Sequence, residues 1–145
     1  MKPGTSIVIG AAFALIGLVG CATPFRAPPD VTHIELERSD SAKVFIPNIW
    51  LERKQGHLAV AGYVQAFYPI EDTTDTHLDV ILYDKTGAVL RTTIGTFEPQ
   101  RIVRRPKHPP LGTYRVVLDP LPQATTRIAV RAHQGIHPIP RHDKS

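Results

Sequence analysis

The sequence predicts an all-β sandwich of six to eight antiparallel strands that follows a cleaved N-terminal signal peptide. Three observations support this fold class. Short segments in which apolar and polar residues alternate recur roughly every ten residues along most of the chain. Fourteen prolines and ten glycines in 145 residues favour many turns. Beyond residue 21, no segment has the apolar spacing of an amphipathic helix.

The alternating segments are interpreted as strands in chain order, at residues 32–37, 44–46, 49–53, 57–67, 78–83, 89–97, 114–118 and 128–132. Lys54-Gln55-Gly56 and Asp84-Lys85-Thr86-Gly87 are typical of hairpin turns, and Gly87 stands where a positive φ is needed. Within the longest strand, Gly62 indicates a bulge or a close approach of another backbone. We expect an immunoglobulin-like or fibronectin-like topology, with a small barrel as the alternative.

The first 21 residues have the features of an export signal. Lys2 supplies a positive charge, and the apolar run 6–19 is shorter than the about 20 residues of a membrane-spanning helix. Leu18-Val19-Gly20-Cys21 resembles the lipobox of bacterial lipoproteins. The resemblance implies cleavage before Cys21, a lipid on its sulfur, and, with Ala22 next, the outer membrane if the host is Gram-negative. The alternative is an ordinary thiol behind a plain signal peptide.

This interpretation divides the chain into four parts: a signal peptide (1–20), a proline-rich lipidated tether (21–31), one β-sandwich domain (32–133) and a flexible Pro/His tail (134–145). The formal charge of +4 is compatible with an anionic membrane or glycan surface, but it is too small to indicate a nucleic-acid-binding protein. The single cysteine leaves no partner for a disulfide.

A second resemblance covers residues 57–133. Gly62-Tyr63-Val64, Leu82-Tyr83-Asp84-Lys85-Thr86-Gly87 and Tyr114-Arg115-Val116 are similar to the pattern of FxLYD-type bacterial surface domains. Gln65 and Ala66 replace the asparagine usual in that family. The resemblance implies an extracytoplasmic immunoglobulin-like sandwich with no assigned chemistry.

Basic residues are the first candidates for a binding site. The densest run lies in a proline-rich loop and contains Arg101, Arg104, Arg105 and Lys107. Arg115, Arg127 and Arg131 have outward parity on the last two predicted strands, so they extend this loop into a basic stripe if those strands are neighbours. Arginine binds phosphate and carboxylate groups through two parallel hydrogen bonds, so the expected ligands are anionic lipid headgroups, an acidic glycan or an acidic protein. The favoured interpretation, as for most charged runs, is nevertheless a solvated loop.

Histidines are the candidates for a metal site. His133, His137 and His142 cluster near the C-terminus, and imidazole suits zinc or copper. They lie among prolines, with no cysteine nearby and no methionine besides Met1, so adventitious binding or none is the favoured interpretation, and we expect no cofactor.

Two further groups of residues bear on function. Tyr63, Phe67 and Tyr83 have a parity opposite to the aliphatic residues of their strands, which indicates an exposed aromatic surface or, as the favoured alternative, a second buried face. The chain lacks the nucleophile, phosphate-loop and metalloprotease motifs, so no catalytic residue is expected. The predicted function is a membrane-anchored lipoprotein whose non-catalytic β-sandwich is an accessory or adaptor module for an envelope protein. Metal binding through the C-terminal histidines is the alternative.

Overall fold

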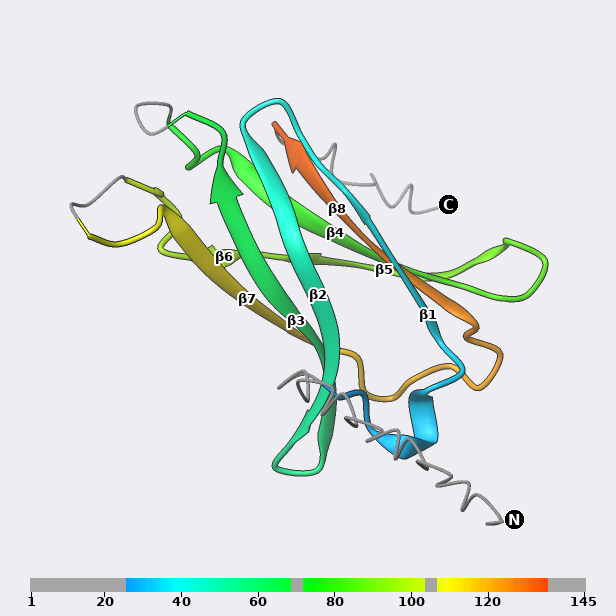
Figure 1. Ribbon diagram of the computed structural model, residues 1–145. Coiled ribbons are helices and arrows are strands. Elements are labelled where there is room, and N and C mark those ends of the chain that lie inside the picture. The colour runs from blue at the N-terminus through cyan, green and yellow to red at the C-terminus, as the bar shows by residue number, and fades with distance from the viewer. Residues whose placement is uncertain (1–25, 69–71, 104–106, 136–145) are drawn as a thin grey trace, which may run out of the picture.

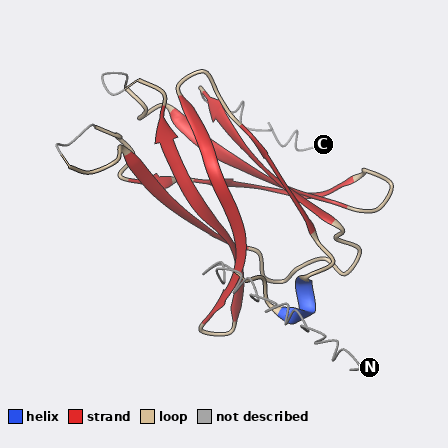
Figure 2. Ribbon diagram, viewed as in Figure 1, coloured by secondary structure: helices blue, strands red, loops and turns tan. Residues whose placement is uncertain are grey.

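The computed structural model describes residues 26–68, 72–103 and 107–135, and these residues form eight strands and one short 3₁₀ turn (Figures 1 and 2). The turn, η1 (Pro29–Val31), precedes the strands. They are β1 (Glu35–Ser39), β2 (Val44–Lys54), β3 (His57–Ala66), β4 (Thr76–Tyr83), β5 (Val89–Gly95), β6 (Phe97–Glu98), β7 (Leu111–Val117) and β8 (Arg127–Gln134).

The strands form two four-stranded sheets that pack face to face (Figure 1). Sheet A has the order β1-β8-β4-β5, and sheet B has the order β2-β3-β7-β6. Every pairing is antiparallel except that of β1 with β8, which is parallel from Glu35↔Arg127 to Ser39↔Arg131. The predicted fold class, an antiparallel β-sandwich of six to eight strands, is confirmed.

The strand order explains how the sandwich relates to the immunoglobulin arrangement, in which strands A, B, E and D face strands C, F and G. In the order of sheet B, β2, β3, β7 and β6 correspond to A, B, E and D, whereas β8 and β4 of sheet A correspond to F and C. The place of strand G, beside β8, is taken by β1 from the N-terminal side of the domain. The parallel strand β1 therefore covers the edge of β8 and becomes the edge of sheet A.

The core lies between the sheets and is built from the inward residues of both. Its largest fully buried side chains include Ile46, Leu58, Leu78, Leu82 and Phe97. Four buried residues outside the strands join it, each at most 7% exposed: Val31 and Ile34 before β1, Ile102 between β6 and β7, and Leu118 after β7. The burial of Val31 corrects the predicted tether, since the packed domain begins at η1 and not after residue 31.

The predicted hairpin turns are confirmed. Gln55 and Gly56 have φ values of 53° and 81°, and Gly87 has a φ of 84°, in the left-handed region that glycine tolerates best. In the second turn, the Asp84 carboxylate accepts hydrogen bonds from the Thr86 hydroxyl (2.6 Å) and from the amides of Thr86 and Ala88. These bonds hold the pKa of Asp84 below its usual range, the Thr86 hydroxyl contributing most.

Several strand boundaries differ from the expectation, and two of the differences have a clear physical reason. Pro47 does not end a strand, because β2 is the edge of sheet B and its pairing with β3 shifts register between Phe45 and Asn48. An edge irregularity accommodates a residue without an N–H. The predicted strand 89–97 is divided at Thr96, where the chain crosses from sheet A to sheet B. Within the described ranges, no helix is long and apolar enough to cross a membrane.

Candidate functional site

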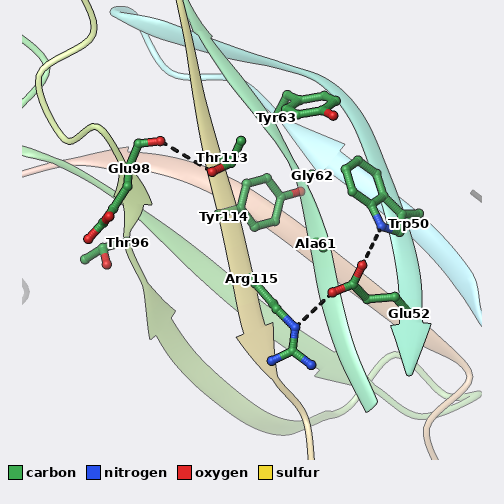
Figure 3. Close-up of a pocket in the computed structure, with 10 residues that line it drawn as sticks. All are labelled: Trp50, Glu52, Ala61, Gly62, Tyr63, Thr96, Glu98, Thr113, Tyr114 and Arg115. Atoms are coloured by element: carbon green, nitrogen blue, oxygen red, sulfur yellow. Dashed lines mark hydrogen bonds and ion pairs between the residues drawn. The ribbon is translucent and has the colours of Figure 1, made fainter. Parts of the chain in front are cut away.

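A groove on the outer face of sheet B results from small residues in β3. Leu58, Val60 and Val64 point into the core, so alternation turns Ala59 and Ala61 outward. Ala61 pairs with Trp50 of β2 on one side and with Arg115 of β7 on the other. Because alanine is much smaller than these neighbours, β3 forms the floor of the groove and the flanking side chains form its walls (Figure 3). The cavity has a volume of about 450 Å³.

A hydrogen-bonded network crosses β3 at one end of this groove. The Glu52 carboxylate accepts a bond from the indole Nε1 of Trp50 (3.2 Å) through Oε2 and one from Nε of Arg115 (2.9 Å) through Oε1 (Figure 3). The two charged side chains are about one-third exposed, at 34% for Glu52 and 33% for Arg115. The network holds the indole and the guanidinium in fixed orientations on opposite sides of the floor.

Tyr63 closes the other end of the groove and contacts Trp50. The ring centroids lie 5.4 Å apart with an interplanar angle of 61°, an edge-to-face arrangement. Both residues are half-buried on the outer face. The favoured interpretation of the aromatic residues as a second buried face is therefore wrong for Tyr63, and also for Phe67, which is 46% exposed. The interpretation as a buried face agrees with the position of Tyr83, whose side chain lies on the outer face of sheet A and is only 7% exposed.

Tyr114 packs beneath the groove from the inner side of sheet B. It pairs with Gly62, and a Cβ added at Gly62 would lie 2.4 Å from the Tyr114 hydroxyl and 2.4 Å from the Asn48 carbonyl oxygen. Gly62 thus marks the close approach that the sequence indicated. The buried Tyr114 hydroxyl has no hydrogen-bond partner among the described residues, and burial raises the pKa of this phenol above its usual value.

The loop between β6 and β7, residues 99–110, carries the predicted basic run. Arg101 and Lys107 are exposed, whereas Arg104 and Arg105 lie outside the described residues. Arg101 and His108 line a second hollow of about 450 Å³ together with Val103 and Leu111.

The first half of this loop has a buried attachment. Thr73, which is 0% exposed, donates its hydroxyl to the Gln100 carbonyl (2.8 Å) and accepts the Ile102 amide (3.0 Å). The Gln100 side chain donates in return to the carbonyl of Thr76 (2.6 Å). Arg101 lies between these two anchored residues, so its backbone is held in place while its side chain faces solvent.

A carboxylate lies near this attachment. The pKa of Asp72 is lowered, mainly by hydrogen bonds from the amide and hydroxyl of Thr74 and to a smaller extent by the positive charge of Arg101.

The predicted basic stripe is not formed. Arg115 lies on β7 in sheet B, whereas Arg127 and Arg131 lie on β8 in sheet A, so the last two strands are not neighbours. The chain crosses between the sheets after Val117. Moreover, Arg115 is paired with Glu52, and Arg127 is paired with Glu37 (2.7 Å) and stacked 4.2 Å from the Tyr83 ring centroid. Arg115 and Arg127 therefore neutralise carboxylates on separate faces.

Of the three histidines considered for metal binding, only His133 lies within the described residues. It pairs with His77 across β8 and β4, with ring centroids 5.0 Å apart. The Nε2 atom of His77 lies 3.6 Å from Oδ1 of Asp79. In the parts of the chain that the structure describes, no three histidine, cysteine, aspartate or glutamate side chains converge into a metal site.

The groove over β3 was not among the sites predicted from the sequence. The signal was the pair of alanines at outward positions in a strand with strong core residues, flanked by strands that carry Trp50 and Arg115. That pattern can be interpreted only once β2 and β7 are known to be the neighbours of β3.

Comparisons with protein-family models, curated proteins and solved structures found no match for this chain.

Proposed function

We propose that this chain is a membrane-anchored lipoprotein of the bacterial cell envelope and that its β-sandwich is a non-catalytic accessory or adaptor module. The lipobox-like Leu18-Val19-Gly20-Cys21 supports the anchor. The anchor's site lies outside the described residues, and among the residues that the structure describes the first buried one is Val31. A covalent lipid would keep the domain close to a membrane surface.

The observation that carries the binding role is the buried attachment of the β6–β7 loop. A solvated loop needs no internal anchors, whereas this one is fixed by Thr73, Gln100 and Ile102 at the base of an exposed arginine. Fixing the backbone beforehand lowers the entropy that a partner must overcome on binding. Arg101 and Lys107 give this surface a positive charge, so the expected partner is an envelope protein with an acidic surface.

Photo-crosslinking in intact cells tests the binding role. A photoreactive residue in place of Arg101 should give a discrete protein adduct, and the same residue in place of Lys85, an exposed cation in the β4–β5 turn, should not. Adducts to lipid or glycan alone at Arg101, or equal adducts at both positions, would contradict an adaptor that acts through this loop.

The anchor is tested separately by labelling cells with an alkyne fatty acid. The wild-type chain should carry the label and fractionate with membranes. The Cys21→Ser variant should carry none. A labelled Cys21→Ser variant would contradict lipidation at this residue.

A metal-binding role is the second candidate, and the contact between His133 and His77 favours it. Two imidazoles on adjacent strands supply part of a ligand set that the C-terminal histidines His137 and His142 would complete. Truncation after residue 135 should abolish zinc affinity under this hypothesis, while an adaptor acting through Arg101 keeps its crosslink.

A further inference from the structure

The groove over β3 is chemically distinct from the basic loop. Two carboxylates, Glu52 and Glu98, and one guanidinium, Arg115, line it. The ion pair of Glu52 with Arg115 cancels one charge of each sign, which leaves Glu98 as the unbalanced charge. The groove therefore disfavours anions, because an anion would add repulsion from Glu98 and gain no unpaired cation.

The position of the groove excludes binding by strand addition. β3 is hydrogen-bonded to β2 along one edge and to β7 along the other, so its backbone has no open edge for a peptide. The walls also lack the apolar surface of a protein-docking site. Of the large apolar side chains that are exposed in the described residues, Val117 lies beside Ala59, and Phe67, which packs against Phe45 with ring centroids 5.0 Å apart, has the outward parity of Tyr63 just after the end of β3, but neither lines the groove. A stable protein interface needs about 1,000 Å² and an apolar centre.

The two aromatic rings limit the ligand further. Trp50 and Tyr63 touch each other, so no cation fits between them as it would in an aromatic cage. Together they form one side of a shallow hollow whose volume lies within the range of small-molecule sites, about 300–1,000 Å³. The hollow is also lined by polar groups: the carboxylates of Glu52 and Glu98, the guanidinium of Arg115 and the hydroxyl of Thr113. These groups are donors and acceptors that suit hydroxyl groups.

We propose that this groove binds the pyranose rings of an uncharged oligosaccharide. The carbon-bound hydrogens on one face of a pyranose form an apolar patch that packs against the electron-rich face of an aromatic ring. The hydroxyl groups at its rim hydrogen-bond to planar carboxylate and guanidinium groups held at fixed positions. The alanines of β3 provide the depth, and the Trp50–Glu52–Arg115 network fixes the polar wall before the sugar arrives. This site is separate from the β6–β7 loop, so the two binding roles succeed or fail independently.

Trp50 is the only tryptophan of the chain, so its fluorescence reports on this groove alone. The full-length protein, held in a detergent without a sugar headgroup, is titrated with chitotetraose, cellotetraose and maltotetraose. At least one should give a saturable change in emission. Tetragalacturonic acid, an anionic counterpart, should bind more weakly by about tenfold or more, and so should a peptide digest.

Matched variants connect the signal to the groove. Ala61→Leu fills the floor and should weaken binding by about tenfold or more, whereas Ala129→Leu, at a buried small residue on the outer face of sheet A, should leave the affinity unchanged. Tyr63→Ala, at a half-buried position less critical for folding, should give the same loss as Ala61→Leu, with circular dichroism confirming the fold of each variant. No saturable change with any of the three neutral sugars would overturn the proposal. Equal affinity in Ala61→Leu and Ala129→Leu, or a preference for the anionic sugar or the peptides, would also overturn it.

Discussion

The central strands β3 and β4 follow each other in the chain and lie in opposite sheets, yet they differ in the size of their side chains. The middle of β3 contains Ala59, Ala61 and Gly62, whereas the equivalent part of β4 contains Val80, Ile81 and Leu82. Both strands bury their inner faces equally well, since Val60 and Val80 are each 0% exposed. The two strands therefore differ in how much space their side chains leave unfilled, and not in how deeply their inner faces are buried.

The two outer faces follow from this difference. Along β4 the outward side chains are large, and Tyr83 packs beneath Arg127, whereas the small Ala129 of β8 lines a smaller hollow of about 310 Å³ beside β1. Over β3, the alanines leave a hollow that Trp50, Tyr63 and Arg115 enclose. On the inner side, Gly62 leaves room for the Tyr114 ring. The small residues of one strand thus create both the groove and the packing beneath it.

The strongest test of this comparison replaces Gly62 with alanine. The new methyl group would collide with the Asn48 backbone and with Tyr114, and a backbone atom cannot move aside as a flexible side chain can. We expect a loss of about 3 kcal/mol in the free energy of unfolding, measured by urea denaturation.

The matched control is Ala61→Ser, which also adds one heavy atom to β3, but into the groove. Its effect should remain within about 0.5 kcal/mol of the wild type. Equal losses in Gly62→Ala and Ala61→Ser would show that both sides of β3 are packed equally tightly, contrary to the comparison.

The second prediction compares the two arginine ion pairs on the outer faces. Arg127→Ala should cost about 1.5 kcal/mol, because it removes both the Glu37 pair and the stacking on Tyr83. Arg115→Ala should cost about 0.5 kcal/mol, because it removes one partly exposed pair beside a hollow. Urea denaturation at low and high salt measures both. An equal cost would indicate that stacking on Tyr83 adds nothing.

Local features of this fold could be predicted because they depend on neighbouring residues. The alternation that makes Leu58 and Val60 inward, and the turn that needs Gly87 at positive φ, are encoded within a few positions. The position of Gly62 likewise signalled a close approach, although the two groups that approach it, Asn48 and Tyr114, come from other strands.

The neighbours of each strand could not be predicted in this way. Arg115 and Arg127 have the parity expected of them, but they face opposite sides of the molecule because β7 pairs with β3 and β8 pairs with β4 and β1. The parallel pairing of β1 with β8 joins segments about ninety residues apart, and no local sequence pattern predicts it. The groove depends on the same long-range pairing, since it exists only where Ala61 lies between Trp50 and Arg115.

The third prediction tests the packing of Tyr114 against β3. Its buried hydroxyl lacks a partner in the described parts of the chain, so Tyr114→Phe should raise the free energy of unfolding by about 1 kcal/mol at pH 7. Tyr63→Phe, the same change at a half-buried position on the outer face, should not produce this gain. Loss of stability in Tyr114→Phe would mean that the hydroxyl makes a stabilising bond.

The pH dependence of the same variant gives an independent test. Burial raises the pKa of Tyr114 in the folded state above 10.0, so the folded protein retains this proton at pH values where the unfolded chain releases it. The contribution of the Tyr114 phenol to the free energy of unfolding is therefore fully present below the unfolded pKa of about 10. It is lost progressively as the pH rises above that value. Phenylalanine has no such proton, so the decline in the free energy of unfolding between pH 9 and about pH 11 should be shallower in Tyr114→Phe than in the wild type or in Tyr63→Phe. Identical slopes in all three proteins would show that the Tyr114 phenol ionises as easily in the folded state as in the unfolded chain, and that the space left by Gly62 is open to water.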